Sequence, residues 1–150
     1  MKRAIELANE NARSGRGGPF GAVIVKNGKI IAEGSNQVTV AQDPTAHAEV
    51  VAIRNACKTL NSFDLTGCEV YTSCEPCPMC LGAIYWSRPD RVYYAATRND
   101  AANAGFDDHF IYEEINVAPS SRKIPMIHVQ DKAVGNIFSA WNSNTLKVRY

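Results

Sequence analysis

The sequence has no long apolar run and no block of like charge. No stretch of about eighteen consecutive apolar residues occurs among the 150 residues, so we expect no membrane-spanning helix. The formal net charge is +1, and without a basic cluster the charge pattern does not indicate a nucleic-acid partner. Internal repeats, low-complexity segments and linkers are also lacking. We therefore expect one globular domain over residues 1–150.

The sequence also lacks the signs of a secreted, disulfide-linked protein. Lys2 and Arg3 lead into an amphipathic helix pattern rather than into the apolar segment of a secretory signal. Five cysteines are present, and an odd number does not suit a framework of paired disulfides. These features favour a cytoplasmic protein with reduced cysteines that are available for metal binding.

What is present is an alternation of helix and strand patterns. Asn27-Gly28 joins two apolar runs, which is a strong signal for a β-hairpin. A strand–helix–strand unit in the middle of the chain favours parallel pairing there, so the sheet should be mixed. We expect a three-layer α/β/α fold, with helices on both faces of a mostly five-stranded sheet. The predicted strands are 22–26, 29–34, 69–72, 91–96 and 124–129, and the main predicted helices are a first one containing Ile5 and Ala12, then 45–60, 77–87 and 135–146.

The most informative motif combines His47-Ala48-Glu49 with Cys77 and Cys80. Imidazole and thiolate groups suit Zn²⁺, and three protein ligands leave the fourth tetrahedral position open for water. Glu49 adds a carboxylate that is not a ligand. This arrangement, H-x-E followed by P-C-x-x-C, is typical of zinc-dependent nucleobase deaminases. We therefore expect one Zn²⁺ per chain, held by His47, Cys77 and Cys80, and an enzyme.

The residues before these ligands predict that both ligand groups lie at helix starts. Asp43 and Pro44 suit the cap and first turn of the helix over 45–60. Pro76 and Pro78 should open the second helix, on which Cys77 and Cys80 share a face. Two helix N-termini would then converge on the metal, and their partial positive charge would favour thiolate over thiol.

A purely structural zinc site is the alternative interpretation of this motif. Such a site normally has a fourth Cys or His ligand, and His109 and His128 lack ligand spacing. Cys74 is better interpreted as a small residue at the end of a strand. Cys57 and Cys68 should be buried and inert.

Three segments resemble the cytidine-deaminase-like superfamily of zinc hydrolases: residues 19–23, 44–49 and 72–80. Within it, residues 82–86, the Ala104-Gly105-Phe106-Asp107-Asp108 stretch and Tyr150 are similar to the bacterial guanine deaminases. The resemblance covers essentially the whole chain. It implies a three-layer α/β/α fold, hydrolysis of guanine to xanthine and ammonia, and a role in purine breakdown.

The resemblance and the chemistry together assign roles to individual side chains. Glu49 should take a proton from the attacking water and deliver protons to the ring nitrogen and the departing amine. Asp108 could accept a hydrogen bond from the base and, as the resemblance suggests, help to move protons. Asn36 follows a strand, where its amide could meet the mixed donor and acceptor edge of guanine. Phe20 and Trp86 are candidates for stacking on the base, and Ala48 and Tyr150 complete the predicted substrate-binding set.

Other functions remain open at this point. A tRNA-specific adenosine deaminase shares the zinc motif but favours a basic surface, which the mixed charges of the last forty or so residues do not provide. A guanosine deaminase would attack the same base and admit ribose, whereas a cytosine or cytidine deaminase would need a smaller pocket. A non-catalytic, zinc-stabilised module is the alternative that is not an enzyme.

The C-terminal segment is aromatic for a free chain end. Trp141 and Tyr150 lie beyond the last predicted strand, and the resemblance implies a dimer in which this segment crosses to the neighbouring subunit. Exchange of this kind needs little new interface chemistry, because the same contacts form between chains. We expect a homodimer in which about residues 130–150 are swapped and Tyr150 closes the partner's active site.

Overall fold

The structure is a computed structural model that describes all residues, 1–150. It divides into two compact units, Met1–His109 and Phe110–Tyr150, which are described separately. The first unit holds α1 (Lys2–Ser14), β1 (Gly21–Lys26), β2 (Lys29–Ser35), α2 (Val38–Ala41), α3 (Ala48–Leu60), β3 (Cys68–Cys74), α4 (Pro78–Ser87), β4 (Arg91–Ala96) and α5 (Arg98–Asn103), and α6 (His109–Asn116) begins at its last residue.

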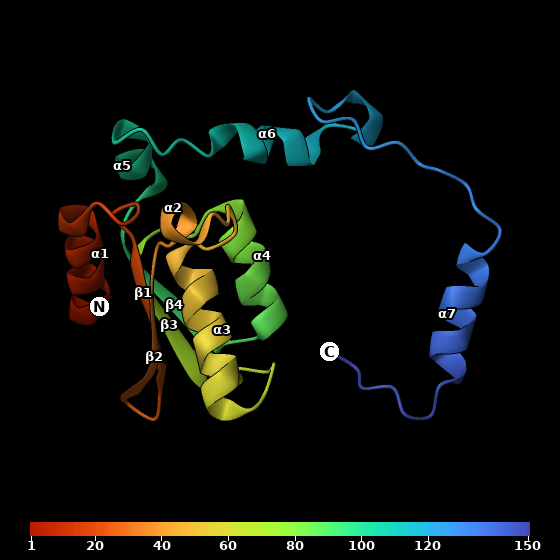
Figure 1. The fold of residues 1–150 in the computed structure, drawn as a ribbon, viewed down its shortest axis with the longest axis horizontal. Helices are drawn as coiled ribbons and strands as arrows, with labels where there is room; N and C mark the ends of the chain where they lie inside the picture. Colours follow the sequence, from red (N-terminus) through yellow and green to blue (C-terminus); the bar gives the residue numbers. More distant parts are fainter. The chain divides into compact units, whose positions relative to one another are not determined.

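A four-stranded sheet in the order β2-β1-β3-β4 forms the centre of the first unit (Figure 1). β1 pairs with β2 and with β3 in antiparallel fashion, and β3 pairs with β4 in parallel. Asn27 and Gly28 both have positive φ angles of 51° and 74°, as a two-residue hairpin turn requires. The predicted hairpin and the mixed sheet are confirmed.

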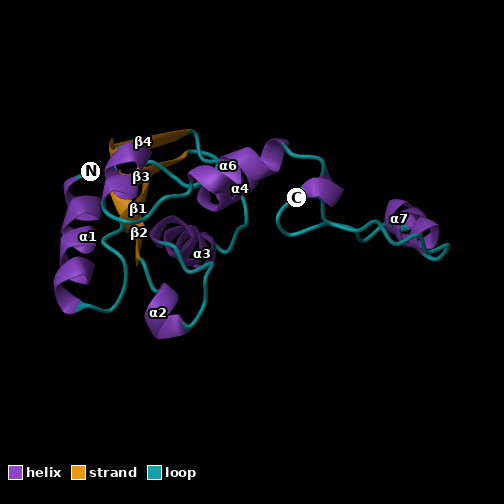
Figure 2. Ribbon diagram, turned by 90° about the horizontal axis from the view of Figure 1, so that it is seen from above, coloured by secondary structure: helices purple, strands orange, loops and turns teal.

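The helices of the first unit cover both faces of this sheet. α1 lies on one face, and α3 and α4 lie on the other (Figures 1 and 2). Alternate residues of β3, from Cys68 to Cys74, are buried, and Val70 and Ile84 belong to the cluster that packs α3 and α4 onto the sheet. The predicted three-layer α/β/α architecture is therefore present.

α3 approaches β2 so closely that a side chain at Gly34 has no room. A Cβ atom there would meet the carbonyl oxygen of Ala48 and the amide nitrogen of Ala52. Glycine allows backbones to approach in this way. The contact fixes the first turn of α3 against the sheet, and this turn carries the predicted catalytic carboxylate.

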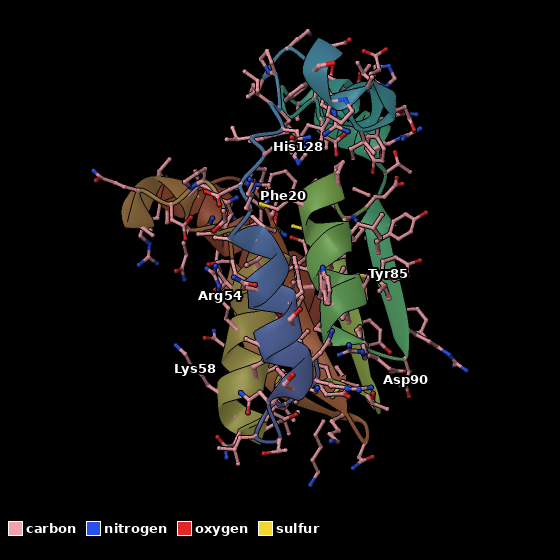
Figure 3. The ribbon with its side chains drawn as sticks, turned by 90° about the vertical axis from the view of Figure 1, so that its right-hand side faces the viewer. Phe20, Arg54, Lys58, Tyr85, Asp90 and His128 are labelled. Carbon is pink, nitrogen blue, oxygen red and sulfur yellow. The ribbon has the colours of Figure 1, made fainter.

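α4 carries almost only apolar side chains around its circumference, which is typical of a helix buried on all sides. Cys80 and Ile84 are buried, whereas Tyr85 and Trp86 are 76% and 66% exposed. Figure 3 labels Tyr85 on α4. These two exposed rings give α4 an apolar outer face.

The expected fifth strand is absent. Residues 124–129 form no strand, and Ile124, Ile127 and Val129 are exposed. Pro125 interrupts this apolar run and has no N–H group to donate to a strand ladder. A short apolar run also does not specify a partner strand. The sheet has four strands rather than five.

The second unit consists of most of α6, a 3₁₀ turn over Pro119–Ser121 and α7 (Val134–Ser143). None of its residues is buried. Ile137, Phe138 and Trp141 give α7 an apolar character, yet all three are exposed. No helix in either unit is both long enough and apolar enough to cross a membrane.

Candidate active site

Three potential metal ligands meet at the ends of two helices. His47, Cys77 and Cys80 each offer one donor atom, and these atoms all lie within 4.8 Å of one another. The Nδ1 atom of His47 is 3.5 Å from the Sγ atom of Cys77 and 3.5 Å from that of Cys80. Cys74 ends β3 and is not part of the cluster. The structure therefore brings together the three residues that the sequence predicted as ligands.

Both helices begin at a proposed ligand. His47 is the N-cap of α3, and Cys77 is the N-cap of α4, with Pro78 in the first turn. The prediction that α3 begins near Thr45 was wrong, because Asp43 accepts hydrogen bonds from the amide and hydroxyl of Thr45 and forms a separate turn. The expected convergence of two helix N-termini is nevertheless present, and it places partial positive charge beside both sulfurs.

The donor set fits a tetrahedral zinc ion. With Zn–S near 2.3 Å and Zn–N near 2.05 Å, two tetrahedral ligand atoms lie about 3.5 Å apart, which matches both nitrogen–sulfur separations. Hydrogen bonds from Cys80 and His47 lower the pKa of the Cys77 thiol to about 4. The pKa of the Cys80 thiol is raised, first by its hydrogen bond to Cys77 and then by burial. Metal binding requires deprotonated thiols, so a bound cation would displace the protons of both cysteines.

Glu49 lies beside the cluster and is almost completely buried, with 6% of its surface exposed. Burial raises the pKa of its carboxyl. The Thr72 hydroxyl donates a hydrogen bond to Oε1 over 3.2 Å, and Cys80 Sγ lies 3.4 Å from Oε2. The two carboxylate oxygens therefore differ, because one faces the sheet and the other faces the cluster.

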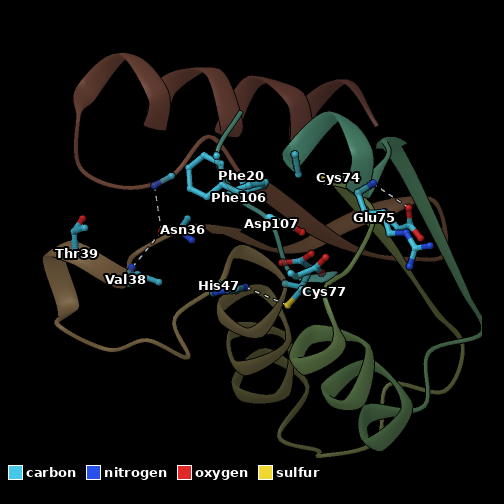
Figure 4. Close-up of a pocket in the computed structure, with 16 residues that line it drawn as sticks. Phe20, Asn36, Val38, Thr39, His47, Cys74, Glu75, Cys77, Phe106 and Asp107 are labelled. Atoms are coloured by element: carbon cyan, nitrogen blue, oxygen red, sulfur yellow. Dashed lines mark hydrogen bonds between the residues drawn. The ribbon is translucent and has the colours of Figure 1, made fainter. Parts of the chain in front are cut away.

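A cavity of about 380 Å³ opens onto His47, Glu49 and Cys77, as the close-up in Figure 4 shows. This volume lies within the range of small-molecule sites, roughly 300–1,000 Å³. The cavity adjoins the carboxyl end of β3, whose last residue, Cys74, lies opposite Ala96 of β4. Ligands of open α/β sheets commonly bind outside the carboxyl ends of the strands.

Two aromatic rings and one buried amide form another part of the cavity wall. Phe20 and Phe106 meet edge to face, with ring centroids 5.0 Å apart and planes 85° apart. Asn36 is buried, and its Oδ1 accepts hydrogen bonds from the amides of Gly18 and Val38 over 3.2 and 3.3 Å. A flat ring with polar groups at its edge could therefore lie near Phe20 and Phe106 while that edge meets Asn36.

Asp107 and Asp108 both line the cavity but differ in their surroundings. The Oδ1 atom of Asp107 accepts a hydrogen bond from the His109 amide at the start of α6. Burial, and then the negative charge on Cys77, raise the pKa of Asp108. Asp107 thus stabilises a helix start, whereas Asp108 is influenced by the predicted metal cluster.

The remaining predicted site residues lie elsewhere. Ala48 is fully buried against β2 and does not line the cavity. Trp86, near the end of α4, is largely exposed and is not a lining residue either. Tyr150 belongs to the second unit. The roles proposed for these three side chains remain predictions.

Sequence reasoning missed several residues of the cavity wall. Phe106 belongs to the quoted Gly-Phe-Asp-Asp stretch but was not expected to bind substrate. Arg98 and Ala101 of α5 also contribute. A signal for α5 was present, since Thr97 and Asp100 form a capping box, a pattern that marks helix starts.

Comparison with known proteins agrees with this geometry. A family model for the cytidine and deoxycytidylate deaminase zinc-binding region matches residues 1–96. The guanine deaminase of Bacillus subtilis (strain 168) is 58% identical over all 150 residues, which cover 96% of that protein. The crystal structure of a Bacillus subtilis guanine deaminase superposes with a TM-score of 0.97, covering 99% of this chain and 95% of that one.

More distant relatives match only part of the chain. A guanine deaminase structure from Nitrosomonas europaea is 36% identical with a TM-score of 0.68, covering 71% of this chain and 62% of the other. A tRNA-specific adenosine deaminase from Aquifex aeolicus is 50% identical over 78 residues, 52% of each protein. Of these relatives, the guanine deaminase of Bacillus subtilis matches essentially the whole chain. The chain therefore belongs to the cytidine and deoxycytidylate deaminase family of zinc-dependent deaminases, and within it to the guanine deaminases.

Proposed function

We propose that this protein hydrolyses guanine to xanthine and ammonia in purine breakdown. The observation that carries the proposal is the identity of 58% to a guanine deaminase over the whole chain, because it includes the segment with Phe106 and Asp108. The family model covers the zinc motif but ends at residue 96, before Phe106 and Asp108. The zinc motif alone therefore does not distinguish among substrates.

The reaction replaces the exocyclic amine at C2 of guanine with oxygen from water. When bound by His47, Cys77 and Cys80, Zn²⁺ supplies the positive charge that lowers the pKa of water to roughly 7. Glu49 accepts the proton that the attacking water loses and passes it to the ring nitrogen. It then accepts the proton of the hydroxyl group formed on C2 and passes it to the amine, so that the C2–N bond breaks, ammonia leaves and C2 keeps the oxygen as a carbonyl. The site gains rate by binding the tetrahedral carbon better than the flat substrate.

Recognition of the base is assigned to the other side chains of the cavity. Asn36 donates from its amide to an acceptor of the purine, such as O6 or N7. Asp108 accepts from a donor of the base, such as N1–H or the amine. Phe20, packed against Phe106, contacts the ring faces. A pocket that pairs with both edges of the base discriminates strongly against bases that lack a partner group.

The cavity charge argues against a phosphorylated substrate. Four carboxylates, from Glu49, Glu75, Asp107 and Asp108, line it against one guanidinium from Arg98. An RNA hairpin would bring additional phosphates to this acidic wall, and RNA-binding sites normally supply a basic surface. This arrangement favours a free base over a tRNA anticodon loop.

The oligomer belongs to the same proposal. α7 exposes Ile137, Phe138 and Trp141, and the second unit has no buried residue. An apolar helix face without a partner favours an interface. We propose a homodimer in which about residues 130–150 pack on the neighbouring subunit and Tyr150 lies over its substrate. The five free cysteines suit a reducing compartment such as the cytoplasm.

An ammonia-release screen tests the substrate assignment. The zinc-loaded protein would be given guanine, guanosine, adenine, cytosine and cytidine under identical conditions, and separately an RNA hairpin containing adenosine. We expect guanine to give the highest kcat/KM. Faster deamination of cytidine or of the hairpin would contradict the assignment, and ammonia release from none of them would favour a non-catalytic zinc module.

A further inference from the structure

Asn11 of α1 is a buried amide that the proposed reaction does not use. Only 7% of its surface is exposed. Its Nδ2 atom donates hydrogen bonds to the carbonyl oxygens of Gly18 and Asn36 over 2.7 and 2.9 Å. One side chain on α1 thus ties together two loop segments that are far apart in the sequence and that both line the cavity.

The same two segments are joined a second time through Asn36 itself. Its Oδ1 accepts hydrogen bonds from the amides of Gly18 and Val38. Its backbone amide donates a hydrogen bond to the carbonyl oxygen of Phe20 over 3.1 Å. Figure 4 shows the hydrogen bond between Asn36 and Val38. We call Asn11, Gly18, Asn36 and Val38, with these hydrogen bonds, the amide clasp.

The clasp decides which end of the Asn36 side chain can meet a ligand. An amide oxygen has two lone pairs, and two backbone N–H groups already use those of Asn36. These donors also fix the orientation of the amide, because the Nδ2 group in that place would face two other donors. Asn36 therefore offers only its NH₂ group to the cavity and recognises acceptors, not donors.

The clasp leaves no room for a side chain at Gly17. A methyl group there would collide with the carbonyl oxygen of Asn36 and would lie 2.8 Å from Nδ2 of Asn11. The backbone of Gly17 is not in the left-handed region, so contact with the clasp, and not backbone strain, is what disfavours a side chain at this position.

We propose that Asn11 is a positioning residue for base recognition. It holds the carbonyls of Gly18 and Asn36 together, so that Asn36 keeps its oxygen turned into the protein and its NH₂ group aimed at an acceptor of the substrate. The inference rests on the proposed function in one respect, namely that Asn36 binds the base. Asn11 itself does not touch the substrate.

Asn11→Leu keeps the size of the side chain and removes both donated hydrogen bonds. Asn55→Leu is the matched control, because Nδ2 of Asn55 likewise donates to a backbone carbonyl, that of Glu33, over 2.9 Å, at an exposed position on α3. Two quantities are compared in the zinc-loaded proteins: hydrogen exchange at the Gly18 and Val38 amides, and kcat and KM for the base that the wild-type protein deaminates best.

We expect faster exchange at Gly18 and Val38 in Asn11→Leu, together with a rise in KM of about tenfold and little change in kcat, because the clasp serves binding and not bond making. Asn55→Leu should match the wild type in both measurements. Unchanged exchange at the two amides, or a loss confined to kcat, would overturn the proposal.

Gly17→Ala perturbs the clasp from its other side and leaves α1 intact, so it serves as the second variant if Asn11→Leu does not fold. It should show the same rise in KM, and a wild-type KM would contradict the clasp. The kinetic measurement uses whichever base is the best substrate, and the hydrogen-exchange measurement needs no substrate. Failure of guanine as a substrate would therefore refute the proposed function without being mistaken for failure of the clasp.

Discussion

The hydroxyl of Thr72 donates a hydrogen bond to Oε1 of Glu49 over 3.2 Å. On the other side of this carboxylate, Cys80 Sγ lies 3.4 Å from Oε2. As a zinc ligand Cys80 would be a thiolate without a proton to donate, so Thr72 would remain the side chain that donates to Glu49. Oε2, on the side of the metal cluster, would then be the oxygen that carries protons during the reaction.

Replacing Thr72 tests this arrangement. Thr72→Val keeps the shape of the side chain and should lower kcat by about 10- to 100-fold, because a hydrogen bond to a charged group contributes about 1.5–3 kcal/mol. Thr72→Ser should recover most of the activity, and zinc content should not change. Thr59→Val, which removes an exposed hydroxyl that donates to Asn55, serves as the control. Full activity of Thr72→Val would show that Glu49 needs no anchor from β3.

Glu49→Gln should retain the fold and the zinc ion but lose nearly all turnover. General acid–base catalysis contributes typically 10²–10⁴-fold, and here one carboxylate is proposed to serve several proton transfers. Zinc content by elemental analysis and kcat by ammonia release are measured on the same preparation. A variant that keeps a tenth of the wild-type activity would mean that another group moves the protons.

The metal site predicts one zinc per chain. Cys77→Ser and Cys80→Ser should each lose tightly bound zinc, whereas Cys57→Ser should keep it, because Cys57 lies outside the cluster. Elemental analysis gives the stoichiometry, and a structure of the zinc-loaded protein gives the ligands. Absence of zinc, or four protein ligands around it, would contradict an open position for water.

Asp108 and Asp107 should respond differently to replacement by alanine. Burial, and then the negative charge on Cys77, raise the pKa of Asp108, whereas Asp107 accepts a hydrogen bond at the start of α6. We expect Asp108→Ala to lose far more kcat/KM for guanine than Asp107→Ala, since an unpaired polar edge of a bound base is costly. Equal losses would remove the distinction between the two carboxylates.

The C-terminal segment makes a separate prediction. Deleting residues 144–150 should sharply reduce guanine turnover and leave zinc content unchanged, because the segment is proposed to close the partner's site and to exclude water. Sedimentation should show a dimer of the full chain. A monomer, or full activity after the deletion, would refute the exchange of this segment and would not affect the zinc chemistry.

The sequence predicts the metal cluster well because ligand type and spacing are local properties. His47, Cys77 and Cys80 each lie at or near a helix start, and proline at position 78 marks one of those starts. The strands of the hairpin are equally clear, because Asn27-Gly28 specifies the turn. Such features can be recognised from a few neighbouring residues, although only folding brings His47 to the two cysteines.

Features that depend on distant segments could not be predicted in this way. Asn11 lies in an ordinary helix pattern, and only the folded chain brings its amide to the carbonyl of Asn36. Phe106 becomes part of the cavity through contact with Phe20. The fifth strand was predicted from apolar content alone, but without a paired neighbour residues 124–129 form no strand.

Product analysis tests the central claim most directly. The zinc-loaded protein and Glu49→Gln are incubated with guanine, and xanthine and ammonia are measured in the same samples over time. We predict one xanthine and one ammonia for each guanine consumed by the wild-type protein, and nearly none with Glu49→Gln. Guanine left intact by the wild-type protein, or equal product formation by the variant, would contradict a zinc-dependent guanine deaminase that works through Glu49.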